Sequence, residues 1–501
     1  MTRIYDQFRA TLSARGNKTA VIDNGQPYSA SRFAELVENT ATTLSKFGLR
    51  RGDRLALILP SSALHGALLL AASKLDLTLL SLDPETPSGA LPELVEKLAP
   101  CALVAMAGSR ASDCGVPVLE AVAATGQLGF QQQLERTDGF IPDAAEISYI
   151  LCTTSGSTGA PKPITLTQRV KLTRARIAAE TYGLDASDCI LLATPMHHTL
   201  AQRLFFLPMI LGGCSVILPH FTPESWLDTI AAEKVTFTMA VSTQLSRIAS
   251  FARADVDGTR DKMASLKAVV ASSSALPDQS KREILALCPC DIHEMYGTSE
   301  TATATDVNLN KDAGKQTSVG RPLPEVELRI LSRDFTDQPT GEVGQIAVKT
   351  AQIFSGYEGM PSQTGAAMHG DFFLTGDLGY LDSDGFLYFS GREKEIIKTG
   401  GTSVFPFDIE RAATLHGDVI EACSFGVPDN LMGEVPVLLV TSAAEAKSTR
   451  RSLRRMLLKN LANIQQPRYV EVVDAMLRTA TGKIDKIGLA SDFMERHGLE
   501  E

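Results

Sequence analysis

The chain has 501 residues, of which 44% are hydrophobic and 21% charged, and its formal net charge at pH 7 is −10. These proportions are ordinary for a globular protein, and the length exceeds what one hydrophobic core usually supports, so we expect at least two domains. The negative charge argues against non-specific nucleic-acid binding. The N-terminus lacks a basic segment followed by an apolar one, and the apolar stretch 67–72 is too short to span a bilayer. We therefore expect no membrane span and a cytoplasmic location.

The cysteines do not form a recognisable metal or redox motif. There are 8 of them, scattered along the chain, and the close pair Cys288 and Cys290 has neither zinc-site nor redox spacing. We expect reduced and mostly buried thiols.

Helical and extended patterns alternate through the first part of the chain. Helices are expected at 32–47 and 63–74, and strands at 54–59 and 77–82. A second series of apolar runs predicts further strands at 190–194, 215–218, 236–241 and 268–271. Such alternation is typical of parallel sheets covered by helices.

The pattern changes in the last third of the chain. Between residues 318 and 391, short strands separated by Gly, Asp and Pro predict a small antiparallel barrel, with strands at 326–331, 344–349 and 385–390. After Arg392, an α+β unit of about one hundred residues follows. Its expected elements are a helix at 406–415, strands at 422–427, 435–441 and 469–473, and a basic helix at 450–461. The predicted domains are therefore 1–392 and 393–501.

Residues 153–162 read TTSGSTGAPK and follow an apolar stretch. Glycines let backbone N–H groups approach anionic oxygens, hydroxyls add donors, and a lysine supplies charge, so the run predicts a phosphate-binding loop. Its spacing is not that of a Walker P-loop, and a simple Ser/Gly-rich turn is the alternative. The binding candidates are Thr153, Thr154, Ser155, Gly156, Ser157, Thr158, Gly159 and Lys162.

Further motifs follow in a fixed order: YGTSE at 296–300, TGD at 375–377, GREKEIIKTGG at 391–401 and TGK at 481–483. Together with the first run they resemble the adenylate-forming superfamily of acyl-CoA synthetases, peptide-synthetase adenylation domains and luciferases, over about residues 20–490. The form of the motifs is most similar to acyl- and aryl-CoA ligases. The resemblance implies an α/β fold: a large N-terminal AMP-binding domain of two helix-covered sheets plus a small β-barrel, and a small, mobile α+β C-terminal domain.

The resemblance assigns catalytic roles around the phosphates of ATP. It places Lys162 near pyrophosphate, although Pro163 stands where the family usually has Gly. Glu300 matches the residue that holds Mg²⁺, a hard carboxylate ligand for a hard cation, with an exposed helix-cap glutamate as the alternative. Thr298 lies in the same motif, and Lys483 matches the lysine that bridges the acyl carboxylate and the α-phosphate.

The resemblance also assigns the nucleoside and acyl contacts. Tyr296 matches the ring that lies against adenine, with Gly297 leaving room at the acyl end, and Asp377 and Arg392 match two ribose contacts. Ser273 stands in a Ser-rich run where relatives commonly have Gly-Gly-Ala, and we include it among the nucleotide-binding candidates.

His198 matches a gate beside the acyl pocket, although a core histidine is the alternative reading. Amino-acid adenylation domains usually carry an aspartate just after this position, whereas residues 199–206 contain no acid. A buried ammonium without a partner is costly, so we expect the substrate not to be an α-amino acid. The residues expected near the acyl pocket, His198, Thr243, Ser272 and Gly297, indicate a mainly apolar or ring-bearing acid.

The last motifs concern the acceptor. Lys394 matches the hinge of the small domain, and Gly400 and Gly401 match a thiolation loop whose form is closer to CoA synthetases than to peptide-synthetase modules. We therefore expect an AMP-producing acid–thiol ligase that uses ATP, Mg²⁺ and CoA. The alternatives are a coronafacate-ligase-like amide ligase with an amine acceptor, the loading of a carrier-protein thiol, and a non-catalytic nucleotide-binding protein.

Overall fold

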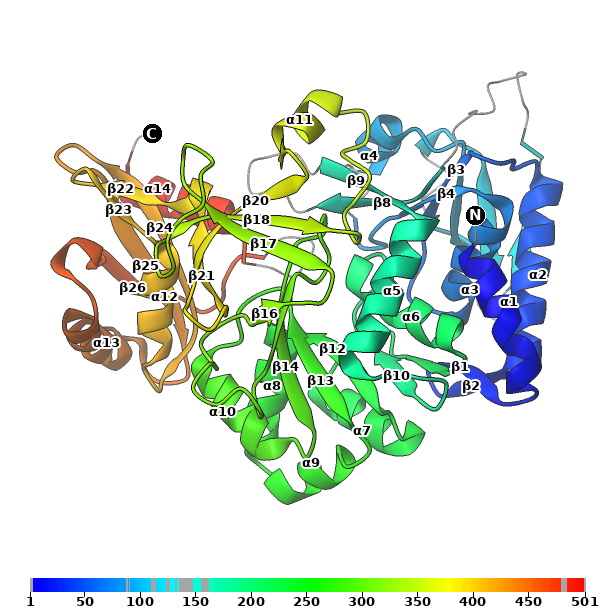
Figure 1. Ribbon diagram of the computed structural model, residues 1–501, viewed down its shortest axis with the longest axis horizontal. Coiled ribbons are helices and arrows are strands. Elements are labelled where there is room, and N and C mark those ends of the chain that lie inside the picture. Colours follow the sequence, from blue (N-terminus) through cyan, green and yellow to red (C-terminus); the bar gives the residue numbers. More distant parts are fainter. Residues whose placement is uncertain are drawn as a thin grey trace.

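The computed structural model describes residues 3–86, 89, 91–109, 114–122, 127–130, 133–134, 147–154, 162–478 and 484–499. In Figure 1 the N-terminal residues lie on the right and the C-terminal residues on the left, with the middle of the chain between them. Two large sheets, a smaller antiparallel sheet and a C-terminal sheet make up the described strands.

The first large sheet has seven strands in the order β7-β6-β5-β3-β4-β8-β9. Its central pairs β3–β4, β3–β5 and β4–β8 are parallel, whereas β8 and β9 form an antiparallel edge. The strands are β3 (Arg54–Ile58), β4 (Thr78–Ser81), β5 (Ala102–Met106), β6 (Val118–Val122), β7 (Gln127–Gly129), β8 (Ser148–Thr154) and β9 (Lys162–Thr167).

The second large sheet has nine strands in the order β16-β15-β14-β13-β12-β10-β11-β1-β2. Strands β12, β13 and β14 are parallel neighbours, so their carboxyl ends share one edge, the edge at which open α/β sheets bind ligands. The strands are β1 (Thr19–Asp23), β2 (Gln26–Ser29), β10 (Cys189–Leu192), β11 (Cys214–Ile217), β12 (Phe237–Val241), β13 (Ala268–Ser272), β14 (Asp291–Tyr296), β15 (Thr305–Asn308) and β16 (Arg321–Pro322).

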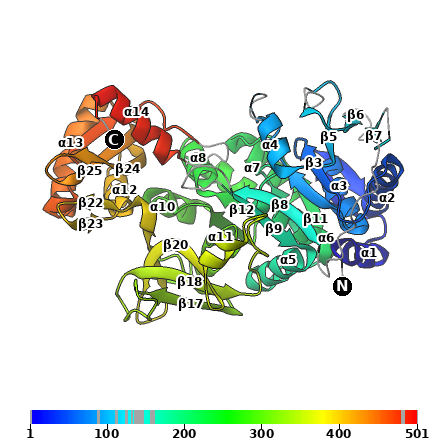
Figure 2. The ribbon, with the colours of Figure 1, turned by 90° about the horizontal axis from the view of Figure 1, so that it is seen from above.

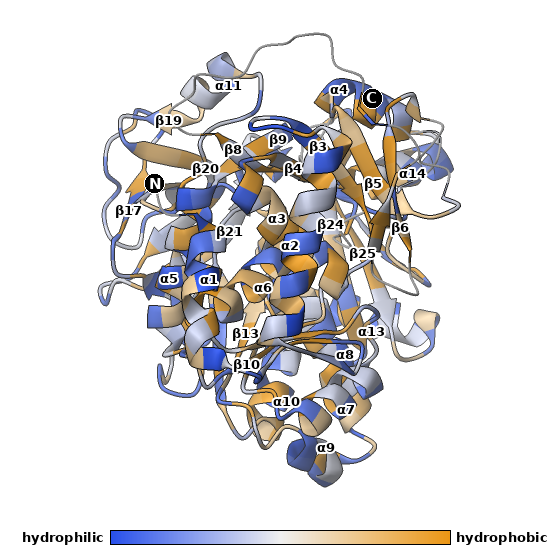
Figure 3. Cartoon of the chain, turned by 90° about the vertical axis from the view of Figure 1, so that its right-hand side faces the viewer, coloured by the Kyte–Doolittle hydropathy of each residue, from blue (hydrophilic) through white to orange (hydrophobic). Residues whose placement is uncertain are grey.

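One hydrophobic cluster joins the two sheets through α3 and α6. Gly66 of α3 packs so closely on α6 that a Cβ there would lie 2.4 Å from the Phe205 ring. The helices of this part are α1 (Ile4–Arg15), α2 (Ala30–Phe47), α3 (Ala63–Leu75), α4 (Leu91–Leu98), α5 (Gln168–Tyr182), α6 (Thr199–Leu211), α7 (Pro223–Glu233), α8 (Ser242–Ala252), α9 (Val256–Lys262) and α10 (Asp278–Leu287). In Figure 3, strand β5 is coloured hydrophobic, whereas α1, α2 and α5 carry hydrophilic residues, as expected for helices covering a sheet.

The third sheet is antiparallel: β17 pairs with β18, β18 with β20, and both β19 and β21 with β20. Seen from above in Figure 2, its strands β17, β18 and β20 lie away from the N-terminal helices. Its elements are β17 (Val326–Leu331), β18 (Gly344–Thr350), α11 (Pro361–Ala366), β19 (Met368–His369), β20 (Phe372–Leu381) and β21 (Leu387–Arg392).

The C-terminal residues form an α+β unit with its own hydrophobic clusters. Its elements are η2 (Glu393–Glu395), β22 (Ile397–Thr399), β23 (Thr402–Val404), α12 (Pro406–Thr414), β24 (Val419–Asp429), β25 (Gly433–Ser442), α13 (Ala446–Asn460), η3 (Asn463–Gln465), β26 (Tyr469–Val472) and α14 (Lys486–His497). Helix α12 packs back on β21 through Phe407, whose ring centroid lies 5.3 Å from that of Phe389.

The predicted α/β class is confirmed, and most predicted elements occur within a few residues of their expected bounds. Strand β17 coincides with the predicted range 326–331. The β1–β2 hairpin and the long strand β20 had not been predicted, since both interrupt their apolar residues with Gly, Pro or polar side chains.

Candidate active site

Two antiparallel strands bring Asp377 and Arg392 together. The residues are register partners in β20 and β21, and the Arg392 Nε lies 3.2 Å from Asp377 Oδ1. Tyr296, the last residue of β14, donates its hydroxyl to Asp377 Oδ2 at 2.8 Å. The structure therefore brings three residues together, although Tyr296 and Arg392 are 96 positions apart in the sequence.

Burial keeps the hydroxyl of Tyr296 protonated. Asp377 is only 4% exposed, and burial together with the nearby Asp377 carboxylate raises the pKa of Tyr296 well above its usual value. The phenol therefore stays neutral and acts as the donor. A carboxylate has about four acceptor positions and can therefore accept hydroxyl donors such as those of a ribose.

The loop between β14 and β15 carries Thr298 and Glu300 in a tight, internally bonded turn. The Thr301 N–H donates to Thr298 Oγ1 at 3.2 Å, and the Ala304 N–H donates to the Tyr296 carbonyl at 2.8 Å. A Cβ at Gly297 would lie 1.7 Å from the Ala302 carbonyl oxygen. A glycine is thus required at position 297 by the backbone of its own loop. This requirement is independent of the predicted role of Gly297, which was to leave space for the acyl group.

Glu300 and Lys162 both contact the side chain of Tyr357. The Tyr357 hydroxyl donates to Glu300 Oε1 at 3.1 Å, and the Lys162 Nζ lies 5.0 Å from the centre of the same ring. Burial, followed by the charge of Glu300, raises the pKa of Tyr357. Tyr357 is therefore a neutral donor that contacts both a cation of β9 and a carboxylate of the 297–304 loop, and no sequence motif had pointed to it.

Arg174 of α5 holds the same loop by hydrogen bonds to its backbone carbonyls. Its Nη2 donates to the carbonyl oxygens of Ser299 at 3.0 Å and Glu300 at 2.9 Å, and its Nε donates to that of Gln352 at 2.9 Å. The residue is 3% exposed. Sequence analysis had missed this positioning residue, because a basic residue in an amphipathic helix is usually solvent-exposed.

The predicted phosphate loop connects β8 to β9. Within the predicted run 153–162, Thr153 and Thr154 end β8 and Lys162 begins β9. Thr154 and Lys162 are register partners, and Thr153 pairs with Pro163. The candidates Ser155, Gly156, Ser157, Thr158 and Gly159 lie outside the described residues.

The residues around Glu300 fit a magnesium ion that is held mainly by a nucleotide. Glu300 offers a half-buried carboxylate, and among the described residues no group of three or more His, Cys, Asp or Glu side chains could form a metal cage. Mg²⁺ is typically bound by one or two carboxylates together with substrate phosphates and water, so the single Glu300 carboxylate suits it.

His198 and Ser273 lie on separate loops at the edge of the second sheet. His198 precedes α6, and its ring centroid is 4.1 Å from that of His197, whose Nε2 lies 3.9 Å from Asp83 Oδ2. Ser273 follows β13, is exposed and has a φ of 76°, a left-handed conformation that is uncommon for a residue other than glycine.

The predicted hinge and thiolation residues lie in the C-terminal part. Lys394 is exposed within η2, and Gly400 and Gly401 form the turn between β22 and β23 with φ values of 54° and 77°. Lys483 lies outside the described residues. Nearby, Lys486 pairs with Glu395 at 2.8 Å and Glu410 at 2.9 Å, which ties the first turn of α14 to the residue after Lys394.

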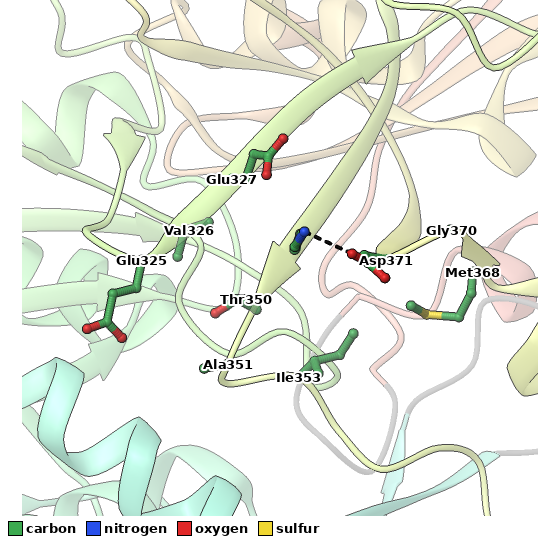
Figure 4. A pocket seen from close by; sticks show the side chains of 10 residues that line it. Glu325, Val326, Glu327, Thr350, Ala351, Ile353, Met368, Gly370 and Asp371 are labelled. Atoms are coloured by element: carbon green, nitrogen blue, oxygen red, sulfur yellow. Dashed lines mark hydrogen bonds and ion pairs between the residues drawn. The ribbon is translucent and has the colours of Figure 1, made fainter.

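An open depression of about 710 Å³ lies on the antiparallel sheet, and none of the predicted site residues lines it. Figure 4 shows its lining, which includes Glu325, Glu327 and Asp371. Lys349, which also lines it, pairs with Asp371 at 2.9 Å. The other two acids of the lining pair with arginines outside it, Glu325 with Arg176 and Glu327 with Arg329, so we assign the depression no role.

Among the helices of the described part of the chain, none is both long and apolar enough to cross a membrane.

Comparison with known proteins agrees with this geometry. The indoleacetate–CoA ligase of Aromatoleum aromaticum is 28% identical over 367 residues, covering 72% of this chain and 71% of the relative. The 2-succinylbenzoate–CoA ligase of Geobacillus kaustophilus is 30% identical over 469 residues, covering 90% and 91%. The structure of the amide bond synthetase McbA from Marinactinospora thermotolerans is 25% identical, with a TM-score of 0.86 over 98% of this chain and 100% of that one.

Two family models also match the sequence. The model of the AMP-binding enzyme C-terminal domain matches residues 408–483. The model of the AMP-binding enzyme covers residues 8–358, more than half of the sequence. The chain therefore belongs to the AMP-binding enzyme family, within the adenylate-forming superfamily.

Proposed function

We propose that the protein is an ATP-dependent ligase that activates a carboxylic acid as its acyl adenylate and transfers the acyl group to CoA. The observation that carries the proposal is the buried Asp377 carboxylate, held by Tyr296 and Arg392 beside the loop that bears Glu300. The family membership and the CoA-ligase relatives support it. The full set of Glu300, Asp377, Arg392 and Lys483 argues against a non-catalytic binding protein, which would have no use for a lysine at the reacting centre.

In the first half-reaction, an acid oxygen attacks the α-phosphorus of ATP while the bond to the β-phosphate oxygen breaks and pyrophosphate leaves. Asp377 and Arg392 hold the ribose, Tyr296 faces the adenine, and residues 153–159 with Lys162 bind the phosphates. Bound at Glu300, Mg²⁺ would neutralise developing phosphate charge. Thr298 and Lys483 bind oxygens at the reacting centre, and His198 borders the acid.

In the second half-reaction, the thiol of CoA loses its proton and its sulfur attacks the acyl carbonyl. AMP leaves with the oxygen that joined its phosphate to the acyl carbon. We propose that residues 393–501 turn about Lys394 between the two steps, so that Gly400 and Gly401 replace Lys483 beside the adenylate. Glycines suit a narrow pantetheine path because they place no side chain in it. At Gly401, no atom outside its neighbours lies within 4 Å of where a Cβ would be.

The similarity to an amide bond synthetase supports one alternative acceptor, an amine. The test is pyrophosphate release over a panel of carboxylic acids, followed by incubation of the best acid with CoA, with amines or with neither, and mass spectrometry of the products. We expect acyl-CoA. Consumption of an amine with CoA left intact would establish the amide ligase, and absence of pyrophosphate release with every acid would overturn the adenylation itself.

A further inference from the structure

Cys189 and Cys214 lie next to each other at the start of two neighbouring strands. They are register partners in the parallel pair β10 and β11, and each is the first residue of its strand. Both are free thiols that are half-buried, so part of each side chain is open to solvent. A hydrogen bond joins the two thiols, although the residues are 25 positions apart in the sequence.

The backbone holds the two residues at a distance that a disulfide can span. Neighbouring strands lie about 4.7–4.9 Å apart, within the usual Cα separation of about 4.4–6.8 Å for disulfides. The Cys214 N–H donates to the Asp188 carbonyl at 2.9 Å, and a Cβ at Gly213 would lie only 2.5 Å from that oxygen. The strand ends therefore approach closely at this position, and the absence of a side chain at Gly213 permits it.

A buried arginine lies near this thiol pair. Arg15, the last residue of α1, is 4% exposed, and a Cβ at Gly212 would lie 3.7 Å from its Nε. Its Nη2 donates to the Pro208 carbonyl, whereas its Nε and Nη1 are buried with no hydrogen-bond partner among the described residues. Burial lowers the pKa of Arg15 to about 10, so the guanidinium is charged at neutral pH. A buried charge without an anion is costly, and a thiolate at Cys214 would supply one.

The surroundings distinguish the two thiols. The Cys189 thiol donates to the Cys214 sulfur, which lowers the pKa of Cys214, and Arg15 lowers it further. Burial and Glu233, at the end of α7, oppose these effects, but the pKa of Cys214 still lies below its usual value. The same hydrogen bond, together with burial, raises the pKa of Cys189. Cys214 therefore forms the thiolate more readily, and Cys189 stays protonated beside it.

A thiolate that is partly open to solvent and lies next to a second thiol is the arrangement found at sites of reversible oxidation. We propose that Cys214 and Cys189 form such a site, in which Cys214 reacts with a hydroperoxide and Cys189 then closes a disulfide with it. The inference goes beyond the proposed function and does not depend on it.

The chemistry balances with hydrogen peroxide as the oxidant. The Cys214 thiolate attacks one peroxide oxygen, the O–O bond breaks, and the departing hydroxide takes up the proton that the thiol had released, giving water and a sulfenic acid. The Cys189 sulfur then attacks the Cys214 sulfur and the S–O bond breaks. The hydroxyl leaves with the Cys189 proton as a second water. Two thiols are thus oxidised to a disulfide while the peroxide is reduced, and an external dithiol reverses the change.

Cys288 and Cys290 provide a comparison within the same chain. They are also close together, but they are only 7% and 9% exposed. Hydrogen bonding to Cys290, followed by burial, raises the pKa of Cys288 well above its usual value. Because this pair is less accessible and Cys288 stays protonated, we expect it to be oxidised more slowly than Cys189 and Cys214.

The first experiment maps the disulfide by mass spectrometry. The reduced full-length protein is treated with a small excess of hydrogen peroxide, its remaining thiols are alkylated, and it is digested with trypsin without reduction. Cleavage after Arg203 places Cys189 and Cys214 on separate peptides, whereas Cys288 and Cys290 share one peptide. We expect a linked pair of peptides containing Cys189 and Cys214 to form first and to separate when dithiothreitol is added.

The second experiment assigns the roles of the residues. In Cys189→Ser the sulfenic acid at Cys214 has no second thiol to react with, so dimedone should label Cys214. In Cys214→Ser, labelling of Cys189 should be at least about threefold slower, because its thiol stays protonated. Arg15→Met should slow disulfide formation by about threefold or more, and Arg15→Lys should retain most of the rate. The matched control is Cys290→Ser, which should leave the link between Cys189 and Cys214 unchanged.

The possible outcomes are distinct. Absence of the linked peptides, or oxidation of wild-type Cys214 directly to a sulfinic acid, would overturn the proposal, and so would a disulfide that forms first between Cys288 and Cys290. Dimedone labelling that favours Cys189 over Cys214 would overturn the assigned roles. These measurements need neither ATP nor an acid substrate, so their failure is separate from a failure of the proposed function. If Arg15→Met fails to fold, the wild-type map, Arg15→Lys and the cysteine variants decide.

Discussion

At the scale of single residues, the candidate site depends on carboxylates whose surroundings differ. Asp377 is buried and shared by Tyr296 and Arg392, whereas Glu300 is half-buried and bonded by Tyr357. The first environment suits a fixed neutral ligand such as a ribose, and the second leaves a carboxylate able to face a cation. Their losses should therefore have different kinetic signatures.

Replacing Asp377 with Ala should raise the KM for ATP by roughly tenfold or more, since it removes acceptors for charged hydrogen bonds. Glu300→Gln should instead mainly lower kcat and shift the dependence on Mg²⁺. Steady-state kinetics at several Mg²⁺ concentrations distinguish them, with Asp382→Ala, which removes a carboxylate paired with Lys315, as the control. Identical and metal-independent defects in both variants would contradict the assigned roles.

Burial in the folded chain lowers the pKa of Lys171 in α5, and this shift predicts how stability depends on pH. Its pKa is about 7 in the folded chain against a usual value of 10.5, so between these values the unfolded chain binds more protons and stability should rise with pH, by at most about 1.4 kcal/mol per unit. Arg174, Arg203 and Cys152 face this lysine, so their charges contribute to the shift. Lys171→Met should lack this rise. Urea unfolding from pH 7 to 9.5 measures it, and parallel curves for the two proteins would refute the shift.

At the scale of elements, the 297–304 loop is fixed from several directions. Its own backbone closes over Gly297, Arg174 of α5 holds two of its carbonyls, and the Phe354 N–H donates to the Glu300 carbonyl at 2.8 Å. These contacts position Thr298 and Glu300 without any ligand. Such a preorganised loop reduces the rearrangement needed during reaction.

Gly297→Ala should lower the free energy of unfolding by about 2 kcal/mol or more and reduce kcat, because the added methyl overlaps the Ala302 carbonyl and moves the loop. Thermal and urea unfolding with parallel kinetics measure both effects. The matched control is Gly365→Ala in α11, where no atom lies within 4 Å of the added Cβ and stability should be unchanged or slightly higher. A Gly297→Ala protein as stable and active as the wild type would show that the loop can relax.

At the scale of the whole molecule, residues 393–501 are joined to the rest through η2 and the Phe389–Phe407 contact. Within this unit, Lys486 is bound by Glu395 and Glu410. Burial alone would lower the pKa of Lys486, but the two carboxylates more than offset it and the pKa lies above its usual value. The lysine therefore stays charged and fixes the chain near Lys483 to the chain near Lys394.

We expect Lys483→Ala and Lys394→Pro to block opposite half-reactions. Lys483→Ala should slow adenylate formation by about a hundredfold and spare thioester formation from supplied acyl adenylate. Lys394→Pro should do the reverse by restricting backbone rotation at the hinge. Lys394→Ala, which keeps the backbone free, is the control for the proline. Equal loss of both half-reactions in either folded variant would contradict a rotation between two orientations.

Sequence by itself determined the fold class and the approximate bounds of most elements, and it proposed the nucleotide-site residues. Periodic apolar runs and glycine-containing motifs depend on neighbouring residues, so they can be recognised in the sequence. Strand β17 was predicted in this way, and Asp377 and Arg392, each predicted from its own motif, are register partners in the structure. The family resemblance further predicted that Lys394 is the hinge and that Gly400 and Gly401 belong to the thiolation loop.

Only the tertiary structure decided which polar groups meet inside the protein. Tyr357 reaches Glu300 across 57 positions, and Arg203 lies beside Lys171 and Arg174 although the sequence places α6 well after them. A lysine or arginine in a helix is usually solvated, and no local pattern shows that another helix will cover it. Burial turns these residues from expected surface charges into interior ones, and burial arises from packing between distant segments.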